Sequence, residues 1–140
     1  MKKRNNRIWN GIIVITVIGC IAAFVLHYKN FVSIEDGEFK VYSGIYRQRI
    51  PLTEFDSISW VARIPQMERR NGFSWLAKEK GVFNDSLTQS TTYVFVDDLR
   101  QQKIRLVHHD SLKLYINLPD SLATQQLYEQ IRSLSVQEVE

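Results

Sequence analysis

The 140-residue sequence has little cysteine and glycine, and each shortage argues against a class of function. Its single cysteine, Cys20, cannot form an intrachain disulfide, and one thiolate cannot build a cysteine-based zinc site. The six glycines form no phosphate-binding loop of the Walker or dinucleotide type. No spacing pairs a nucleophile with a base or sets two carboxylates for acid–base catalysis. We therefore predict a protein that is not an enzyme and uses no cofactor.

Histidine is also scarce, with three residues in the chain. His108 and His109 are adjacent, and neighbours on a strand point to opposite faces of a sheet, so we expect this pair not to chelate one ion. Asp97 and Asp98 are adjacent carboxylates, which we expect to be solvated on a turn. The sequence therefore predicts no metal site.

Basic charge is missing from most of the chain, although the formal net charge is +3. Five of the 18 Lys and Arg residues lie in the first 30 positions, and all 15 Asp and Glu residues follow them. Residues 31–140 therefore carry 13 basic and 15 acidic side chains, a net charge of −2. A nucleic-acid-binding domain concentrates basic charge on its folded part, so we expect no nucleic-acid partner.

An uncharged segment, residues 8–28, separates the basic tail of residues 1–7 from Lys29. As a helix its 21 residues would span about 31 Å, close to the hydrocarbon thickness of a bilayer. Trp9 and Tyr28 lie at its ends, where amphipathic rings favour the membrane interface. The segment is therefore predicted to be a single transmembrane helix.

Two alternatives compete with this transmembrane interpretation. A cleaved signal peptide would fit the length, but no A-x-A pattern followed by polar sequence is present. The residues from Val17 to Cys20 resemble a bacterial lipobox, which would make Cys20 a lipidation site. Against this, the six residues after Cys20 are apolar, whereas mature lipoproteins usually become polar at once. Each interpretation, except cleavage, attaches the chain to a membrane.

The charges beside the segment predict its orientation. Lys2, Lys3, Arg4 and Arg7 precede it, and acidic residues soon follow Lys29. The positive-inside rule then places the N-terminus in the cytoplasm. For a bacterial inner membrane, the following domain would face the periplasm.

Residues 31–135 have the pattern of one small, mainly β domain. Alternation with a period of two is clearest in residues 91–96, 103–108 and 112–116. Asp36-Gly37 and Ser43-Gly44 are turn signals that predict a meander of short antiparallel strands. Residues 64–72 have the composition of a polar, turn-rich loop. The expected result is a barrel or sandwich of about seven strands.

The last predicted element is a C-terminal helix that caps this sheet structure. The segment Pro119-Asp120-Ser121 supplies an N-cap. An apolar stripe follows at spacings of four, four and three residues, and it comprises Ala123, Leu127, Ile131 and Leu134. Residues 136–140 are expected to form a frayed tail.

An ordered series of short segments resembles the bacterial pleckstrin-homology-like (PH-like) domains of small membrane-anchored proteins, which are frequent in Bacteroidota. The segments cover most of residues 38–131 and are Tyr42-Ser43-Gly44-Ile45-Tyr46, residues 50–58, Ile64-Pro65, residues 69–73, residues 80–83, and residues 115–118 leading to Thr124 and Leu127-Tyr128. The resemblance implies a seven-stranded fold capped by a helix. It implies no common activity.

The most basic stretch of the domain is a candidate ligand-binding region, although a solvated loop would have the same composition. Its cationic side chains are Arg63, Arg69, Arg70, Lys78 and Lys80. Arginine and lysine at this density could recognise anionic lipid headgroups or an acidic partner.

We expect, however, that the domain is a membrane-anchored interaction module that binds a protein partner or self-associates. The groove between the strands and the C-terminal helix, or an exposed strand edge, is the expected binding surface. Recognition of anionic lipid headgroups through residues 63–80 is the alternative.

Overall fold

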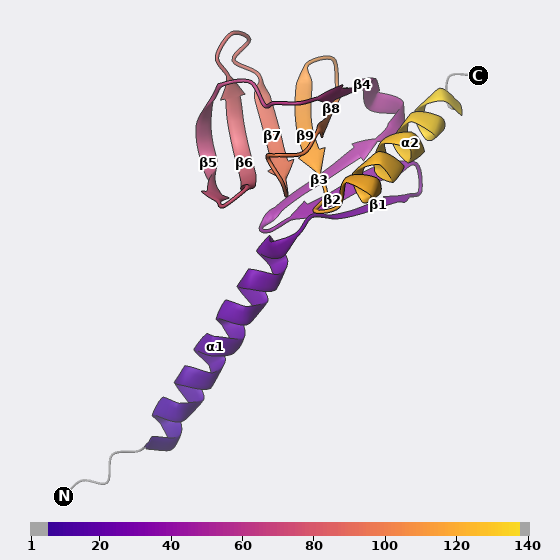
Figure 1. Cartoon of the computed structure of the whole chain (residues 1–140). Helices are drawn as coiled ribbons and strands as arrows, with labels where there is room; N and C mark the ends of the chain where they lie inside the picture. The colour runs from indigo at the N-terminus through magenta and orange to yellow at the C-terminus, as the bar shows by residue number, and fades with distance from the viewer. Residues whose placement is uncertain (1–5, 138–140) are drawn as a thin grey trace, which may run out of the picture.

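The N-terminal helix α1 (Asn6–Tyr28) extends away from a β-rich body in the computed structural model, which describes residues 6–137 and side chains up to residue 135 (Figure 1). No residue of α1 is buried, and its most apolar window has a mean hydropathy of 2.4. It is the one described helix that is long and apolar enough to cross a bilayer, properties that a signal sequence shares.

The first sheet is a three-stranded antiparallel meander of β1 (Phe31–Glu35), β2 (Glu38–Ser43) and β3 (Tyr46–Pro51). Phe39 and Val41 of β2 are fully buried, whereas Tyr42 points outward, as period-two alternation requires. The turns fall at Asp36-Gly37 and at Gly44-Ile45. The predicted meander is therefore confirmed.

The second sheet has six strands in the order β4-β8-β9-β7-β6-β5. A 3-10 turn, Leu52–Glu54, leads into it from β3. All of its neighbouring strands are antiparallel except β7 and β9, which are parallel. The strand bounds are β4 (Phe55–Val61), β5 (Met67–Trp75), β6 (Lys78–Asp85), β7 (Thr91–Val96), β8 (Lys103–His108) and β9 (Leu112–Asn117).

The described residues form nine strands, where the sequence predicts about seven. The main error is the loop predicted over residues 64–72, because β5 begins at Met67. β5 is an edge strand that pairs with β6, and six of its nine side chains are exposed. An edge strand whose side chains are mostly exposed to solvent carries polar residues. It therefore lacks the apolar alternation by which buried strands are recognised in a sequence.

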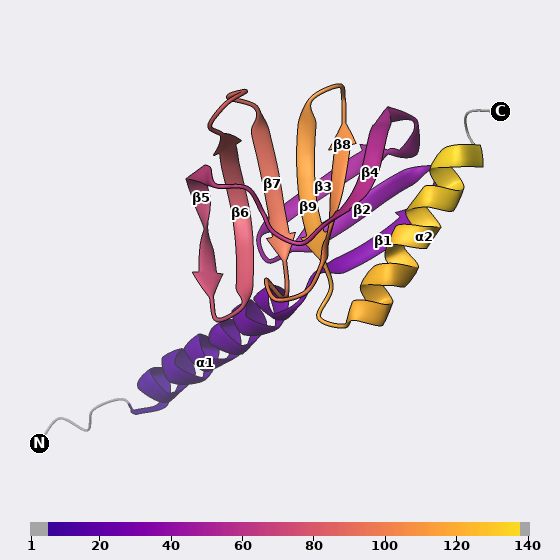
Figure 2. The same ribbon diagram turned by 45° about the horizontal axis from the view of Figure 1, so that its top comes forward.

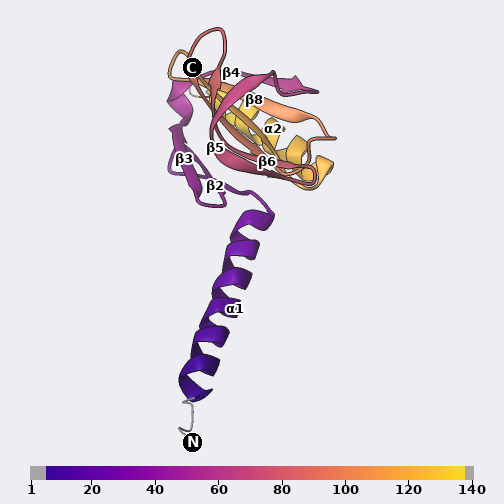
Figure 3. The same ribbon diagram turned by 90° about the vertical axis from the view of Figure 1, so that its left-hand side faces the viewer.

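The main core lies between the two sheets and the C-terminal helix α2 (Ser121–Gln137). It joins Phe39 and Ile50 of the small sheet to Ile104 and Ile116 of the large one. Figure 3 shows the two sheets as separate layers, and Figure 2 shows α2 on the side of the body where β1 and β4 lie. A smaller cluster, with Phe83 and Val94, packs on the other face of the large sheet under the β4–β5 connection.

α2 confirms the predicted cap and stripe. The carboxylate of Asp120 accepts hydrogen bonds from the backbone N–H groups of Leu122 and Ala123. Leu127 and Ile131 are buried in the core. The helix continues to Gln137, so the first two residues of the predicted frayed tail are helical, whereas residues 1–5 and 138–140 lie outside the described part of the chain.

Candidate functional site

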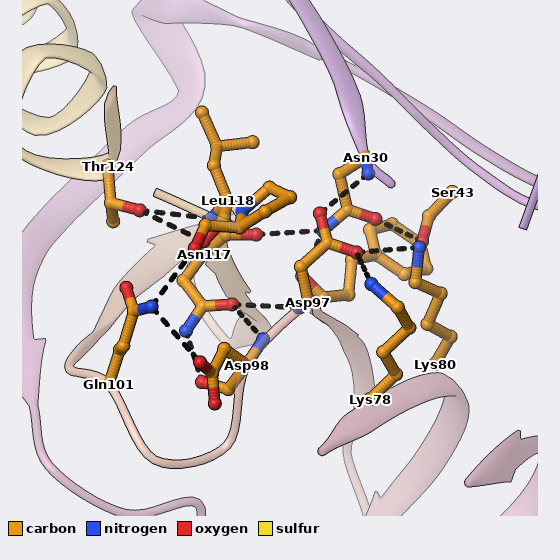
Figure 4. Close-up of polar contacts among 12 residues, drawn as sticks. Asn30, Ser43, Lys78, Lys80, Asp97, Asp98, Gln101, Asn117, Leu118 and Thr124 are labelled. Atoms are coloured by element: carbon orange, nitrogen blue, oxygen red, sulfur yellow. Dashed lines mark hydrogen bonds and ion pairs between the residues drawn. The ribbon is translucent and has the colours of Figure 1, made fainter. Parts of the chain in front are cut away.

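A buried asparagine just after α1 ties the helix to both sheets. The side-chain Nδ2 of Asn30 donates to the carbonyl oxygens of Phe95 (2.6 Å) and Asn117 (2.9 Å), in β7 and β9. Its Oδ1 accepts a 2.5 Å hydrogen bond from Ser43 Oγ of β2, and its backbone N–H donates to Asp97 Oδ2 at 2.7 Å. Every polar atom of the side chain is therefore used to hold the end of α1 at one place on the body (Figure 4).

Asp97 brings a buried negative charge to this junction. Its Oδ1 lies 2.9 Å from Lys80 Nζ, and both side chains are completely buried. Lys78 Nζ lies 3.6 Å from the same oxygen. Burial lowers the pKa of Lys80, and the charge of Asp97 opposes this effect. The buried ammonium therefore depends on its contact with Asp97 for stabilisation.

Asp98 and Asn117 fix the turn that follows β7. Asn117 Oδ1 accepts hydrogen bonds from the backbone N–H groups of Asp97 (2.8 Å) and Asp98 (3.1 Å). The Asp98 carboxylate accepts from the Arg100 guanidinium at 2.9 and 3.1 Å and from Gln101, and hydrogen bonds from Arg100 lower the pKa of Asp98 to about 2. The prediction that Asp97 and Asp98 are solvated is therefore wrong. The Asp98 carboxylate is held by its near neighbours Arg100 and Gln101. The partners of the Asp97 carboxylate are remote in sequence, and local sequence does not reveal them.

A surface groove of about 570 Å³ lies beside this network, between α2 and the end of β4. The rings of Trp60 and Tyr128 stack there, with centroids 4.6 Å apart and an interplanar angle of 26°. Gln101 joins the groove to the network, since its Nε2 donates to both Asp98 and the Pro119 carbonyl. The groove lining is Trp60, Gln101, Gln102, Ser121, Leu122, Thr124, Gln125, Tyr128, Glu129 and Arg132.

The groove meets β4, an outer strand of the large sheet, at Trp60. Within residues 6–137, β4 has one strand partner, β8. The other edge of β4 carries backbone N–H and C=O groups that a further strand would satisfy. The arrangement can therefore offer main-chain hydrogen bonds, an aromatic surface and the charges of Glu129 and Arg132 to one ligand.

The five cationic residues singled out in the sequence do not form one surface. Arg69 of β5 pairs with Glu79 at 2.7 Å and lies over the Phe83 ring, on the face covered by the β4–β5 connection. Lys78 and Lys80 of β6 contact Asp97.

The other two cations lie away from this junction. Arg63, in the β4–β5 connection, lines a second pocket of about 370 Å³. Arg70 is exposed on β5.

His108 and His109 come together, contrary to the expectation that they point to opposite faces. β8 ends at His108, and His109 has a left-handed backbone with φ of 49°. This conformation directs the His109 ring toward the His108 ring, and the two Nδ1 atoms lie 2.8 Å apart. Residues 6–137 contain no group of three or more His, Cys, Asp or Glu side chains placed to hold a metal ion.

Cys20 lies on the exposed surface of α1, and the helix continues unbroken for eight residues beyond it.

No family model, curated protein or solved structure matches the chain.

Proposed function

We propose that the chain is a membrane-anchored interaction module without catalytic activity, whose body binds a segment of a protein partner between β4 and α2. α1 would anchor it in a bacterial inner membrane with the body in the periplasm. The body would be PH-like, a proposal supported by its two sheets and C-terminal helix. The observation that carries the proposal is the groove of about 570 Å³ that meets β4, an outer strand of the large sheet, at Trp60.

The groove offers what an extended peptide needs. The edge of β4 supplies main-chain hydrogen bonds, and the stacked pair of Trp60 and Tyr128 supplies a rigid aromatic surface. Leu122, at the start of α2, is an exposed apolar side chain in the groove lining. Aromatic and aliphatic anchors with a polar rim are typical of protein-binding surfaces.

Two carboxylates of the body, Asp85 and Asp98, are unsuited to act as a general acid or base near neutral pH. A general acid or base needs a pKa near the working pH. Hydrogen bonds from Lys113 and from backbone N–H groups lower the pKa of Asp85 to about 2, and Arg100 does the same for Asp98. Both carboxylates therefore stay ionised near neutral pH and keep their hydrogen bonds to Lys113 and Arg100.

Binding of anionic lipid through residues 63–80 is less well supported. Arg69, Lys78 and Lys80 are already paired with carboxylates, and they lie on two faces of the large sheet. A headgroup site needs several unpaired cations that converge on one point.

Photocrosslinking of the full chain in cell membranes tests the proposal. Gln125, on the groove-facing side of α2, is replaced by benzoylphenylalanine. We expect a discrete crosslinked product, which Leu122→Glu abolishes because it places a charge in the apolar part of the groove. Leu87→Glu is the matched control, since Leu87 is an exposed leucine on the β6–β7 turn that does not line the groove.

The crosslinked product also identifies the kind of partner. A product of twice the chain mass indicates self-association, and a product of another mass indicates a different protein. No discrete product, or a product that survives Leu122→Glu as well as it survives Leu87→Glu, would contradict binding in this groove.

A further inference from the structure

The end of the body from which α1 leaves carries a group of exposed apolar side chains. Among the described residues beyond α1, the exposed large hydrophobic side chains are Phe31, Tyr42, Ile45, Trp75, Leu76, Leu87 and Leu122. The β2–β3 and β5–β6 hairpins lie at the end of the body from which α1 leaves (Figure 1). They carry Ile45 on the β2–β3 hairpin, and Trp75 and Leu76 on the β5–β6 hairpin, which are 74%, 53% and 86% exposed. These three residues are called the hairpin tips below.

The hairpin tips lie beside the last turns of the apolar helix. The Trp75 ring meets the Phe24 ring edge-on, with centroids 6.0 Å apart. The backbone N–H of Gly44, next to Ile45, donates to the Leu26 carbonyl at 3.2 Å. Phe24 precedes Tyr28, the last residue of α1, by four positions, which corresponds to about 6 Å along a helix axis. Both hairpins therefore reach back along the predicted membrane-spanning segment.

The local backbone at Leu76 gives no reason for a large apolar residue there. Leu76 has a φ of 53°, in the left-handed region that favours glycine or asparagine in a two-residue turn. A leucine in this conformation is strained relative to glycine, and exposure to water brings no compensating burial. An apolar environment around the turn would supply that compensation.

Two lysine ammonium groups lie over aromatic rings near the end of α1. Lys78 Nζ, which also contacts Asp97, is 5.1 Å from the centre of the Tyr28 ring, and Lys29 Nζ is 5.2 Å from the centre of the Phe31 ring. Apolar side chains, aromatic rings and lysine stems are the side-chain types that favour a membrane interface.

We propose that the hairpin tips insert into the interfacial layer of the same bilayer that α1 spans, so that the body rests on the membrane. The occupant of this surface is lipid, because the tips are continuous with the apolar surface of α1. The inference rests on the proposed membrane anchoring by α1 and adds a second contact between the chain and the bilayer. Asn30 lies two residues after the end of α1, and its hydrogen bonds fix the position of the body relative to the helix and so to the proposed bilayer.

Fluorescent probes on the full chain in phosphatidylcholine nanodiscs test the inference. An environment-sensitive probe is attached to single cysteines made by Ile45→Cys, Leu76→Cys or Leu87→Cys in a Cys20→Ser background. The native Cys20 carries the probe in a fourth sample and reports α1 itself. Quenching by nitroxide-labelled lipid is compared with quenching by aqueous iodide. The lipid is zwitterionic, so attraction between net charges cannot produce the result.

We expect probes at residues 45 and 76 to be quenched several-fold more by the lipid nitroxide than the probe at residue 87, and to be shielded from iodide. Leu87 is the matched position, because it is 93% exposed on a turn at the opposite end of β6. If Cys20 is quenched by lipid while residues 45 and 76 behave like residue 87, α1 is an anchor but the inference is wrong. If lipid does not quench Cys20 either, the anchoring proposal and the inference both fail.

Discussion

At the scale of single residues, Asp97 is the meeting point of the buried polar network. Its carboxylate receives the Asn30 backbone N–H on one oxygen and the Lys80 ammonium on the other. Asp97→Asn keeps the shape of the side chain but leaves a buried ammonium without a counter-charge. We expect a loss of about 3 kcal/mol in the free energy of unfolding, the usual cost of breaking one partner of a buried ion pair. Denaturant unfolding of the full chain in detergent, followed by tryptophan fluorescence, measures it.

Two further variants separate charge from packing. Asp36→Asn changes a carboxylate whose side chain is 92% exposed, and it should leave stability nearly unchanged. Adding Lys80→Met to Asp97→Asn removes the uncompensated charge and should restore much of the lost stability. A double variant as unstable as Asp97→Asn alone would show that the network stabilises through its hydrogen bonds and not through the ion pair.

His108 makes the stability of the body depend on pH. Its pKa is lowered from 6.5 to about 4, first by burial and then by the nearby His109 ring, against an opposing effect of Asp56. Between pH 6.5 and 4 the unfolded chain therefore binds a proton at this position that the folded chain does not. Stability from this residue is present above pH 6.5 and is lost as the pH falls toward 4.

We expect the free energy of unfolding to fall by about 3 kcal/mol over this range because of His108, since its pKa falls from 6.5 to about 4 and each pKa unit is worth about 1.4 kcal/mol. Unfolding curves at a series of pH values, compared with those of His108→Leu, isolate the effect. The variant should show a flatter pH profile in the same interval. Parallel profiles for the two proteins would assign the acid sensitivity to other groups.

At the scale of elements, β5 shows where sequence patterns succeed and where they stop. β7, β8 and β9 have no exposed position, because core residues lie against both faces of the sheet, and their apolar β-forming residues are enough to predict them as strands. β5 is an exposed edge strand, and its Gly72 lies opposite Gly81 of β6. A pair of facing glycines gives no side-chain pattern, although it allows the two backbones to approach closely.

This close approach predicts a strong effect of Gly72→Ala. Gly72 has a φ of 141°, and an added Cβ would lie 2.3 Å from the Lys80 carbonyl oxygen. We expect the variant to lose about 2 kcal/mol of unfolding free energy through backbone strain and displacement of β6. Gly11→Ala in α1 is the control, because no atom lies within 4 Å of its added Cβ. Equal stability of the two variants would contradict the tight pairing of β5 and β6.

The candidate site was predictable only in outline. The amphipathic stripe of α2 indicates that the helix packs on the sheet, and a groove beside it follows from that packing. The stacking of Trp60 on Tyr128 does not follow, because it depends on which end of β4 lies against α2. The role of Asn30 is equally hidden, since an asparagine after an apolar helix has the pattern of an ordinary solvated cap.

At the scale of the whole molecule, the proposed anchoring makes the side of the membrane that holds the body decide which partners could reach the groove. Four basic residues precede the apolar segment, and residues 31–140 carry a net charge of −2. We expect a reporter that is active only outside the cytoplasm to be active when fused after Glu140, and a reporter active only inside to be silent. The opposite result would place the body in the cytoplasm and direct the search to cytosolic partners and inner-leaflet lipids.

The Asn30 network also has a consequence for the order of events during synthesis. The partners of Asn30 in Phe95, Asp97 and Asn117 follow it by 65, 67 and 87 residues. A growing chain presents its apolar helix long before the last of these strands emerges, so under the proposed anchoring the helix would enter the membrane while its junction with the body is still unformed. Contacts of such long sequence separation form late. The final angle between anchor and body is therefore set only when β9 joins β7, as one of the last steps of maturation.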